Sequence, residues 1–204
     1  MKAILFDLDN TLINTHDVLN NYLINMTKKY YKITPKEEHV LETTTIEEVM
    51  KWMKNHNIKI HFWTKIFTVI HFSFTDIKHI KPLPNATKIL EKWSKKFPLG
   101  IITNGPNIYA KKVMRLNDIT KYFKTIQTTS RNRPKPNPEM IYKAAKKIGV
   151  QPKDCIVIDD GKAGIEAGTK AGCITIYLSK NNDVKANYYA KNLIEVNRIL
   201  EKIN

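Results

Sequence analysis

Two carboxylates stand two residues apart near the start of the chain, where Asp7 and Asp9 follow the apolar run Ala3-Ile4-Leu5. Such a run predicts a buried strand, and strand side chains two residues apart point to the same side. Two negative charges held so close repel each other unless a cation or a shared proton relieves them. A divalent cation would leave one carboxylate as nucleophile and the other as general acid and base. The segment therefore predicts catalysis, although a non-catalytic strand end followed by an Asp-Asn-Thr turn would have the same sequence pattern.

Three later segments also place polar residues at the ends of predicted strands or in the loops after them. These polar residues are Thr103 and Asn104, then Lys135, then Asp159 and Asp160. Each pattern is weak by itself, because short motifs often occur by chance.

Together the four segments resemble the motifs of the haloacid dehalogenase superfamily of phosphohydrolases, in which each motif sits at the carboxyl end of a parallel strand. The resemblance covers essentially the whole predicted core. Asn10 is a small departure, because many members carry glycine there; asparagine also tolerates unusual backbone angles. Within the superfamily, the sequence resembles the members that are similar to phosphoglycolate phosphatase and β-phosphoglucomutase.

This resemblance implies a role for each polar residue. Asp7 would attack phosphorus and become a transient aspartyl-phosphate, and Asp9 would protonate the leaving oxygen and then deprotonate water. The Thr103 hydroxyl and the Asn104 backbone N–H would hold phosphate oxygens. Lys135 would offset the remaining negative charge of the phosphate and the nucleophile.

The same resemblance implies Mg²⁺ as cofactor, a hard cation that prefers oxygen ligands. Its ligands would be Asp7, the backbone carbonyl of Asp9, and Asp160. Asp159 takes the position that often acts through a bound water. Because the two roles could be exchanged, both Asp159 and Asp160 are candidate ligands.

The elements that must position these residues alternate between strand and helix. Strands are predicted at 2–6, 99–103, 125–128, 156–159, 174–178 and 188–190. Helices are predicted at 85–96, 108–115, 138–148, 162–171 and 193–202. This pattern predicts an α/β fold with a Rossmann-like, doubly wound parallel sheet that is covered on both faces.

Between residues 15 and 81 the alternation is lost, and we interpret this span as a small α-helical cap inserted into a catalytic core made of residues 1–14 and 82–204. Pro82-Leu83-Pro84 suits the point of return to the core, because prolines stop helices and stiffen the chain. Within the span, apolar residues recur at helical spacing over 16–31, 46–56 and 62–74. In the family such an insertion closes over a small substrate.

Composition limits the class of protein. Of the 204 residues 42% are hydrophobic, enough for a core, so disorder is not expected. We expect no signal peptide, because Met1-Lys2 leads straight into a strand whose apolar run is interrupted by carboxylates. We expect no membrane partner, because no stretch of 18 uncharged apolar residues occurs. Cys155 and Cys173 are expected to be buried reduced thiols. The chain therefore reads as a soluble, cytoplasmic protein, with no prediction of its oligomeric state.

The net charge of +15 arises from 34 Lys and Arg against 19 Asp and Glu, and such an excess attracts anions. The basic residues are scattered, with no run of five or more. This indicates a lysine-rich surface rather than a nucleic-acid site, so nucleic acid is a possible but not a favoured partner.

Asp9 separates two chemistries within the family, because dehalogenases displace halide and generally lack this second carboxylate. We therefore predict a Mg²⁺-dependent phosphatase that acts on a small phosphorylated metabolite, such as phosphoglycolate or a sugar phosphate. The alternatives are a nucleic-acid 3′-end phosphatase, a sugar-phosphate mutase, or a non-catalytic binding or regulatory protein of the same fold. The presence of Asp7, Asp9 and Lys135 disfavours the last.

Overall fold

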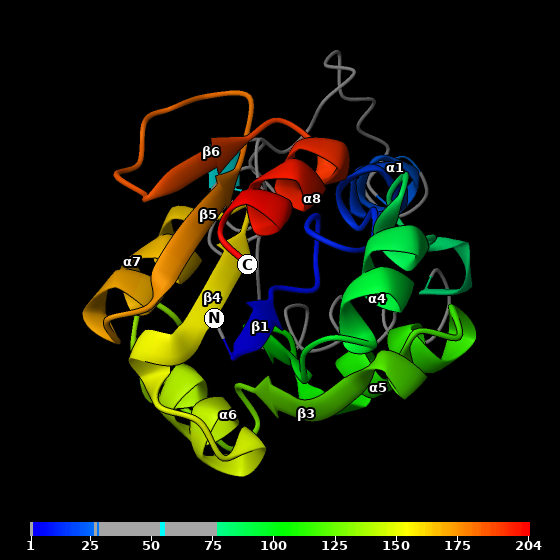
Figure 1. The fold of residues 1–204 in the computed structure, drawn as a ribbon. Helices are drawn as coiled ribbons and strands as arrows, with labels where there is room; N and C mark the ends of the chain where they lie inside the picture. Colours follow the sequence, from blue (N-terminus) through cyan, green and yellow to red (C-terminus); the bar gives the residue numbers. More distant parts are fainter. Residues whose placement is uncertain (1, 27, 29–53, 56–76) are drawn as a thin grey trace. The chain divides into compact units, whose positions relative to one another are not determined.

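The computed structural model describes residues 2–26, 28, 54–55 and 77–204 (Figure 1). By its internal contacts the chain divides into two compact units, Met1–Ile13 with Pro82–Asn204, and Asn14–Lys81. The first unit corresponds to the predicted catalytic core, apart from Asn14. That the second unit acts as a cap stays a prediction. Of the second unit the structure describes α1 (His16–Met26), whereas the predicted helices 46–56 and 62–74 lie almost wholly outside the described residues.

The first unit contains one six-stranded parallel sheet with the order β3-β2-β1-β4-β5-β6. Its strands are β1 (Ala3–Phe6), β2 (Leu99–Thr103), β3 (Phe123–Thr128), β4 (Cys155–Asp159), β5 (Ile174–Leu178) and β6 (Tyr188–Ala190). The prediction of an α/β fold with a doubly wound parallel sheet is confirmed.

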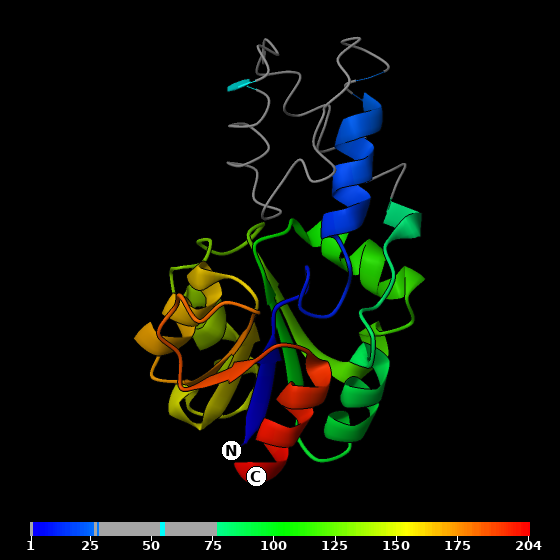
Figure 2. The ribbon, with the colours of Figure 1, turned by 90° about the horizontal axis from the view of Figure 1, so that it is seen from above.

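Five α-helices of this unit cover the two faces of the sheet: α4 (Ala86–Ser94), α5 (Asn107–Leu116), α6 (Glu139–Ile148), α7 (Lys162–Lys170) and α8 (Leu193–Lys202). Figures 1 and 2 show α6 and α7 on one face, and α4 and α8 on the other. Three short 3₁₀ helices complete the described elements, at Ile77–His79, Thr120–Tyr122 and Pro152–Asp154. No helix among the described residues is long and apolar enough to cross a membrane.

Buried strands explain why the sheet forms here. Every residue of β1, β2 and β4 is buried, as expected for parallel strands covered on both faces. On one face Leu5 and Val157 pack with Met140 of α6, and the buried, unbridged Cys155 and Cys173 belong to the same cluster. On the other face the Trp93 indole N–H of α4 donates to Asn197 Oδ1 of α8 at 2.9 Å.

The order in which strands are added to the sheet reverses at β1, in the middle of the sheet. From β1 the strand order runs through β2 to β3 on one side, and through β4 to β5 on the other. Phe6 pairs with Ile158, and the Asp7 N–H continues the ladder by donating to the Ile158 carbonyl at 2.9 Å. The carboxyl ends of β1 and β4 therefore meet where an α/β sheet usually binds its ligand.

Candidate active site

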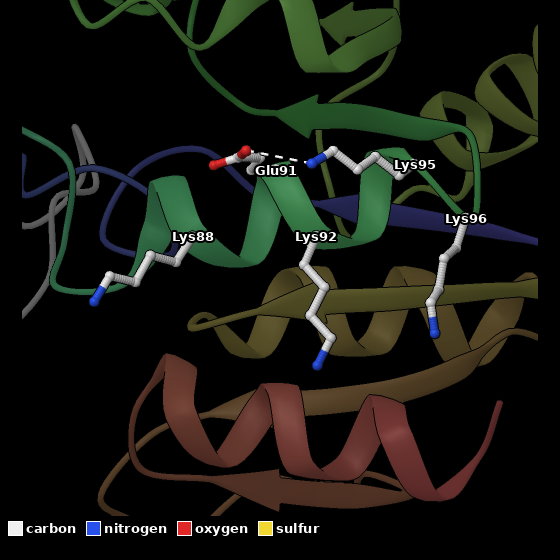
Figure 3. A pocket seen from close by; sticks show the side chains of 5 residues that line it. All are labelled: Lys88, Glu91, Lys92, Lys95 and Lys96. Carbon is white, nitrogen blue, oxygen red and sulfur yellow. Dashed lines mark hydrogen bonds and ion pairs between the residues drawn. The ribbon is translucent and has the colours of Figure 1, made fainter.

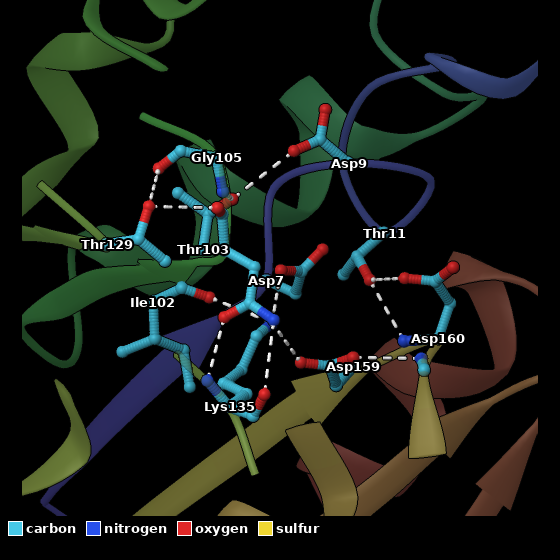
Figure 4. A network of polar contacts seen from close by, with 12 residues as sticks. Asp7, Asp9, Thr11, Ile102, Thr103, Gly105, Thr129, Lys135, Asp159 and Asp160 are labelled. Carbon is cyan, nitrogen blue, oxygen red and sulfur yellow. Dashed lines mark hydrogen bonds and ion pairs between the residues drawn. The ribbon is translucent and has the colours of Figure 1, made fainter. Parts of the chain in front are cut away.

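The polar residues singled out in the sequence come together at the carboxyl edge of the sheet (Figure 4). Asp7 follows β1, Thr103 ends β2, and Asp159 ends β4 with Asp160 directly after it. Lys135 lies in the loop between β3 and α6 and reaches back to the centre of the site. Strand ends far apart in the sequence thus bring their side chains into one buried group.

Lys135 is the centre of this group. Its ammonium donates to Asp7 Oδ1 at 2.5 Å, to Asp159 Oδ2 at 2.8 Å and to the Ile102 carbonyl at 3.2 Å. The side chains of Lys135 and Asp7 are only 6% and 7% exposed. Burial lowers the pKa of Lys135, but attraction to Asp159 and Asp7 outweighs burial and raises it above the ordinary value. Lys135 is therefore a charged ammonium with three acceptors.

One ammonium does not balance the carboxylates around it. Asp7, Asp159 and Asp160 offer oxygens within 4.8 Å of one another, so with all three carboxylates ionised the group, including the ammonium, has a formal charge of −2. Burial, and then repulsion by Asp159, raises the pKa of Asp160 to about 7. Burial also raises the pKa of Asp7 well above its ordinary value; Lys135 lowers it, whereas the neighbouring carboxylates raise it. The group fits a divalent metal ion, which would supply the missing positive charge through oxygen ligands.

Thr11 fixes the position of Asp160. The Thr11 hydroxyl donates to Asp160 Oδ1 at 2.8 Å and accepts from the Asp160 N–H at 3.1 Å. The turn that carries Thr11 includes Asn10 at φ +57°, a left-handed conformation that asparagine tolerates better than most residues. The loop after β1 thus holds the carboxylate of the residue that directly follows β4.

Asn104 uses its side chain to hold the loop that carries Lys135. The Asn104 amide oxygen accepts from the Lys135 N–H at 2.8 Å, and its amide nitrogen donates to the Lys135 carbonyl at 3.3 Å. The family resemblance implied the Asn104 backbone N–H as a phosphate ligand, and nothing in the sequence predicted this side-chain contact. A phosphate-binding role for the Asn104 backbone stays a prediction.

Asp9 lies apart from the Lys135 group and points toward Thr103 (Figure 4). Its Oδ2 accepts from the Thr103 hydroxyl at 3.3 Å, and its Oδ1 accepts from the Tyr109 hydroxyl at 2.5 Å. Tyr109 was not a predicted site residue. It lies in the first turn of α5, six residues after Thr103, and no short motif marks it.

Gly164 gives Asp159 the space it occupies. A Cβ added at Gly164 would lie 1.7 Å from Asp159 Oδ2, the oxygen that accepts from Lys135. We expect Gly164→Ala to push this carboxylate off the ammonium and lower kcat/KM for a phosphate ester about 10- to 100-fold. The crowding should also cost about 1–3 kcal/mol of unfolding free energy. Steady-state kinetics and urea unfolding measure the two effects.

The matched control is Gly168→Ala on the same helix. Its added Cβ would lie 2.7 Å from Thr175 Cγ2 and 3.2 Å from Val157 Cβ, and Asp159 is not among its nearest contacts. This variant should lose stability by overpacking and keep most of its kcat/KM. Equal losses of kcat/KM in both variants would mean that α7 as a whole, and not the Asp159 carboxylate, had moved.

A separate cavity of about 450 Å³ lies along α4, away from these carboxylates (Figure 3). It is lined by Lys88, Glu91, Lys92, Lys95 and Lys96. Lys95 pairs with Glu91 at 3.3 Å, and Lys92 pairs with Glu201 of α8. The cavity is thus a basic surface groove in which two lysines already have acidic partners.

Comparisons with known proteins identify the family. The profile of haloacid dehalogenase-like hydrolases matches residues 4–178. A Clostridium perfringens protein provisionally named pyrophosphatase PpaX is 28% identical, over 100% of this chain and 99% of its own length. Phosphoglycolate phosphatase of Aquifex aeolicus is 28% identical, over 86% of this chain and 83% of its own.

The fold comparison agrees. The crystal structure of a Thermotoga maritima protein provisionally named β-phosphoglucomutase matches with a TM-score of 0.81 at 24% identity, over 100% of both chains. With the profile match over most of the sequence, the chain belongs to the haloacid dehalogenase-like hydrolases, as its motifs indicated.

Proposed function

We propose that this enzyme is a Mg²⁺-dependent phosphatase that hydrolyses a small phosphorylated metabolite through an aspartyl-phosphate on Asp7. The observation that carries the proposal is the Asp7 carboxylate, which is buried directly after β1 in the middle of the sheet and in contact with Lys135. A phosphate ester is negatively charged, so an attacking carboxylate needs positive charge beside it. Lys135 supplies part of that charge at the nucleophile itself.

The reaction divides between two carboxylates. Asp7 attacks phosphorus, the ester P–O bond breaks, and Asp9 gives its proton to the leaving oxygen. Water then attacks the aspartyl-phosphate, Asp9 takes the proton from that water, and the bond between phosphorus and Asp7 breaks. Thr103 stands beside Asp9, where its hydroxyl can turn to a phosphate oxygen. Lys135 stays protonated throughout.

Asp7, Asp159 and Asp160, with the backbone carbonyl of Asp9, are the groups that would hold Mg²⁺. The formal charge of −2 that the ionised group would carry and the all-oxygen donor set support a hard divalent cation. When bound, Mg²⁺ supplies Lewis-acid stabilisation of negative charge on the phosphoryl oxygens.

Phosphate release tests the proposal. The purified protein is incubated with p-nitrophenyl phosphate, phosphoglycolate, several sugar phosphates and a 3′-phosphorylated oligonucleotide, each with Mg²⁺ or with EDTA. We expect Mg²⁺-dependent release from at least one small monoester. Release from the oligonucleotide alone would favour a nucleic-acid end phosphatase, and phosphate migration within a sugar without release would favour a mutase. No reaction with any of them would overturn the proposal.

Inorganic pyrophosphate is a second candidate substrate and belongs in the same panel. Relatives from Bacillus cereus and Bacillus mycoides are named pyrophosphatase PpaX, at 24% and 21% identity. Attack by Asp7 on one phosphoryl group would release the other as phosphate, a leaving group that needs less help from Asp9 than an alcohol does.

Metal binding has a readout besides turnover. We expect saturating Mg²⁺ to raise the unfolding temperature, because a ligand at 100 times its Kd stabilises a fold by about 2.7 kcal/mol, roughly 5–10 °C for a domain of this size. In Asp160→Asn the increase should largely disappear. Differential scanning calorimetry measures both. Asp118→Asn, at a carboxylate whose side chain is 84% exposed, is the control and should keep the full increase.

A further inference from the structure

Two hydroxyls hold the Asp9 carboxylate, one on each oxygen. Tyr109 donates to Oδ1 at 2.5 Å, and Thr103 donates to Oδ2 at the longer distance of 3.3 Å. The Thr103 oxygen accepts from the Gly105 N–H at 2.9 Å, so its own hydrogen can point to Asp9. The contacts are unequal: the bond to Oδ1 is short, whereas the contact to Oδ2 is longer than the usual range of about 2.5–3.0 Å for an O–H···O hydrogen bond.

Packing fixes the Tyr109 ring. Tyr109 is only 6% exposed and lies in the first turn of α5, directly after the strand end that carries Thr103. A Cβ added at Gly105 would lie 3.1 Å from Tyr109 Cδ1, so the ring lies close over a residue that has no side chain. The hydroxyl is thus aimed at Asp9 by a ring with little room to turn.

We propose that Tyr109 is a positioning residue for proton transfer: its short hydrogen bond holds Oδ1 of Asp9 and so orients the carboxyl group, whose Oδ2 beside Thr103 carries the proton. The inference rests on the proposed phosphatase function and adds to it a residue from outside the four motifs. The Tyr109 proton stays on Tyr109. The proton that moves passes from Asp9 Oδ2 to the leaving oxygen as the ester bond breaks, while Thr103 turns toward the phosphate.

This role makes the effect of losing the hydroxyl depend on the leaving group. p-Nitrophenolate departs as a stable anion and needs little protonation, phenolate needs more, and the alkoxide of benzyl alcohol needs most. The ratio kcat/KM reports steps up to formation of the aspartyl-phosphate, in which the leaving group departs. A residue that matters only for folding or for phosphate binding would affect all three esters alike.

The test is Tyr109→Phe, which keeps the buried ring and removes only the hydroxyl. We expect kcat/KM to fall less than about 3-fold for p-nitrophenyl phosphate and about 10- to 100-fold for benzyl phosphate, with phenyl phosphate between them. Tyr142→Phe is the matched control: this tyrosine is 46% exposed and its hydroxyl donates to the Lys170 carbonyl at 3.4 Å. It should leave all three values unchanged. Thermal unfolding of each variant checks the fold.

The outcomes separate the two proposals. If the wild-type enzyme hydrolyses these esters and Tyr109→Phe loses the same factor on all three, or loses nothing, the positioning role is wrong and the phosphatase function stands. If the wild-type enzyme releases phosphate from none of these esters and from none of the metabolite panel, the phosphatase function is wrong and the role of Tyr109 fails with it.

Discussion

Asp7→Asn is expected to lower the rate of phosphate release by at least about 10⁴-fold, because it removes the nucleophile and the other groups cannot replace it. Asparagine has nearly the same shape, and its amide oxygen can still accept from Lys135. The substitution therefore tests the nucleophile rather than the architecture of the site. Single-turnover phosphate release with excess enzyme measures the loss without interference from product release.

The same variant should unfold at an equal or higher temperature than the wild type in the absence of metal. Burial and neighbouring carboxylates raise the pKa of Asp7, which means that the fold disfavours the charged form. A neutral amide removes that cost. Retention of more than about 1% of wild-type turnover would place the nucleophile elsewhere. Asp118→Asn, at an exposed ion pair with Lys121, controls for the substitution itself.

The expected loss of activity and retention of stability in Asp7→Asn have one cause, the crowding of carboxylates at this site. Three carboxylates gathered around one lysine are unfavourable for folding without a metal, and useful for binding one. A protein selected for stability alone would replace one of them. Asp7 and Asp160 are therefore the positions at which stability and catalysis are expected to oppose each other most clearly.

The sequence predicted the strands well where burial is complete. Short apolar runs that end in polar residues correspond to β1, β2 and β4 within one residue at either end. The prediction was weaker at β3, which begins at Phe123 rather than at residue 125. The first two residues of β3 are a half-buried Phe123 and an exposed Lys124, so the hydrophobic pattern starts later than the strand.

The candidate site was predictable as a set of residues but not as a set of contacts. Strand ends in one parallel sheet meet at one edge, which is enough to bring Asp7, Thr103 and Asp159 together. The Tyr109–Asp9 and Asn104–Lys135 contacts depend on how α5 and the loop before α6 pack against that edge. No spacing of residues in the sequence predicts this packing.

Lys135→Met is expected to affect both turnover and stability. Methionine keeps the unbranched shape of the side chain and removes the ammonium, so phosphate release should fall about 10³-fold. Asp7 and Asp159 lose their buried partner, and breaking such a pair costs about 3–5 kcal/mol. Lys143→Met, at a half-exposed lysine paired with Glu139 at 2.7 Å, is the control and should change neither quantity appreciably.

The pH dependence of this loss follows from its cause. Without the ammonium, which lowers both, the pKa values of Asp7 and Asp160 rise further above those of the unfolded chain. A carboxyl with a higher pKa in the folded state takes up a proton on folding, so stability falls as the pH rises from about 4 through the folded pKa. Lys135→Met should therefore be destabilised more at pH 8 than at pH 5, as measured by urea unfolding in EDTA.

Adding Mg²⁺ at pH 8 should restore part of the loss, because the cation replaces the missing charge. A loss of stability that is the same at both pH values, and indifferent to Mg²⁺, would show that Lys135 acts through packing rather than charge.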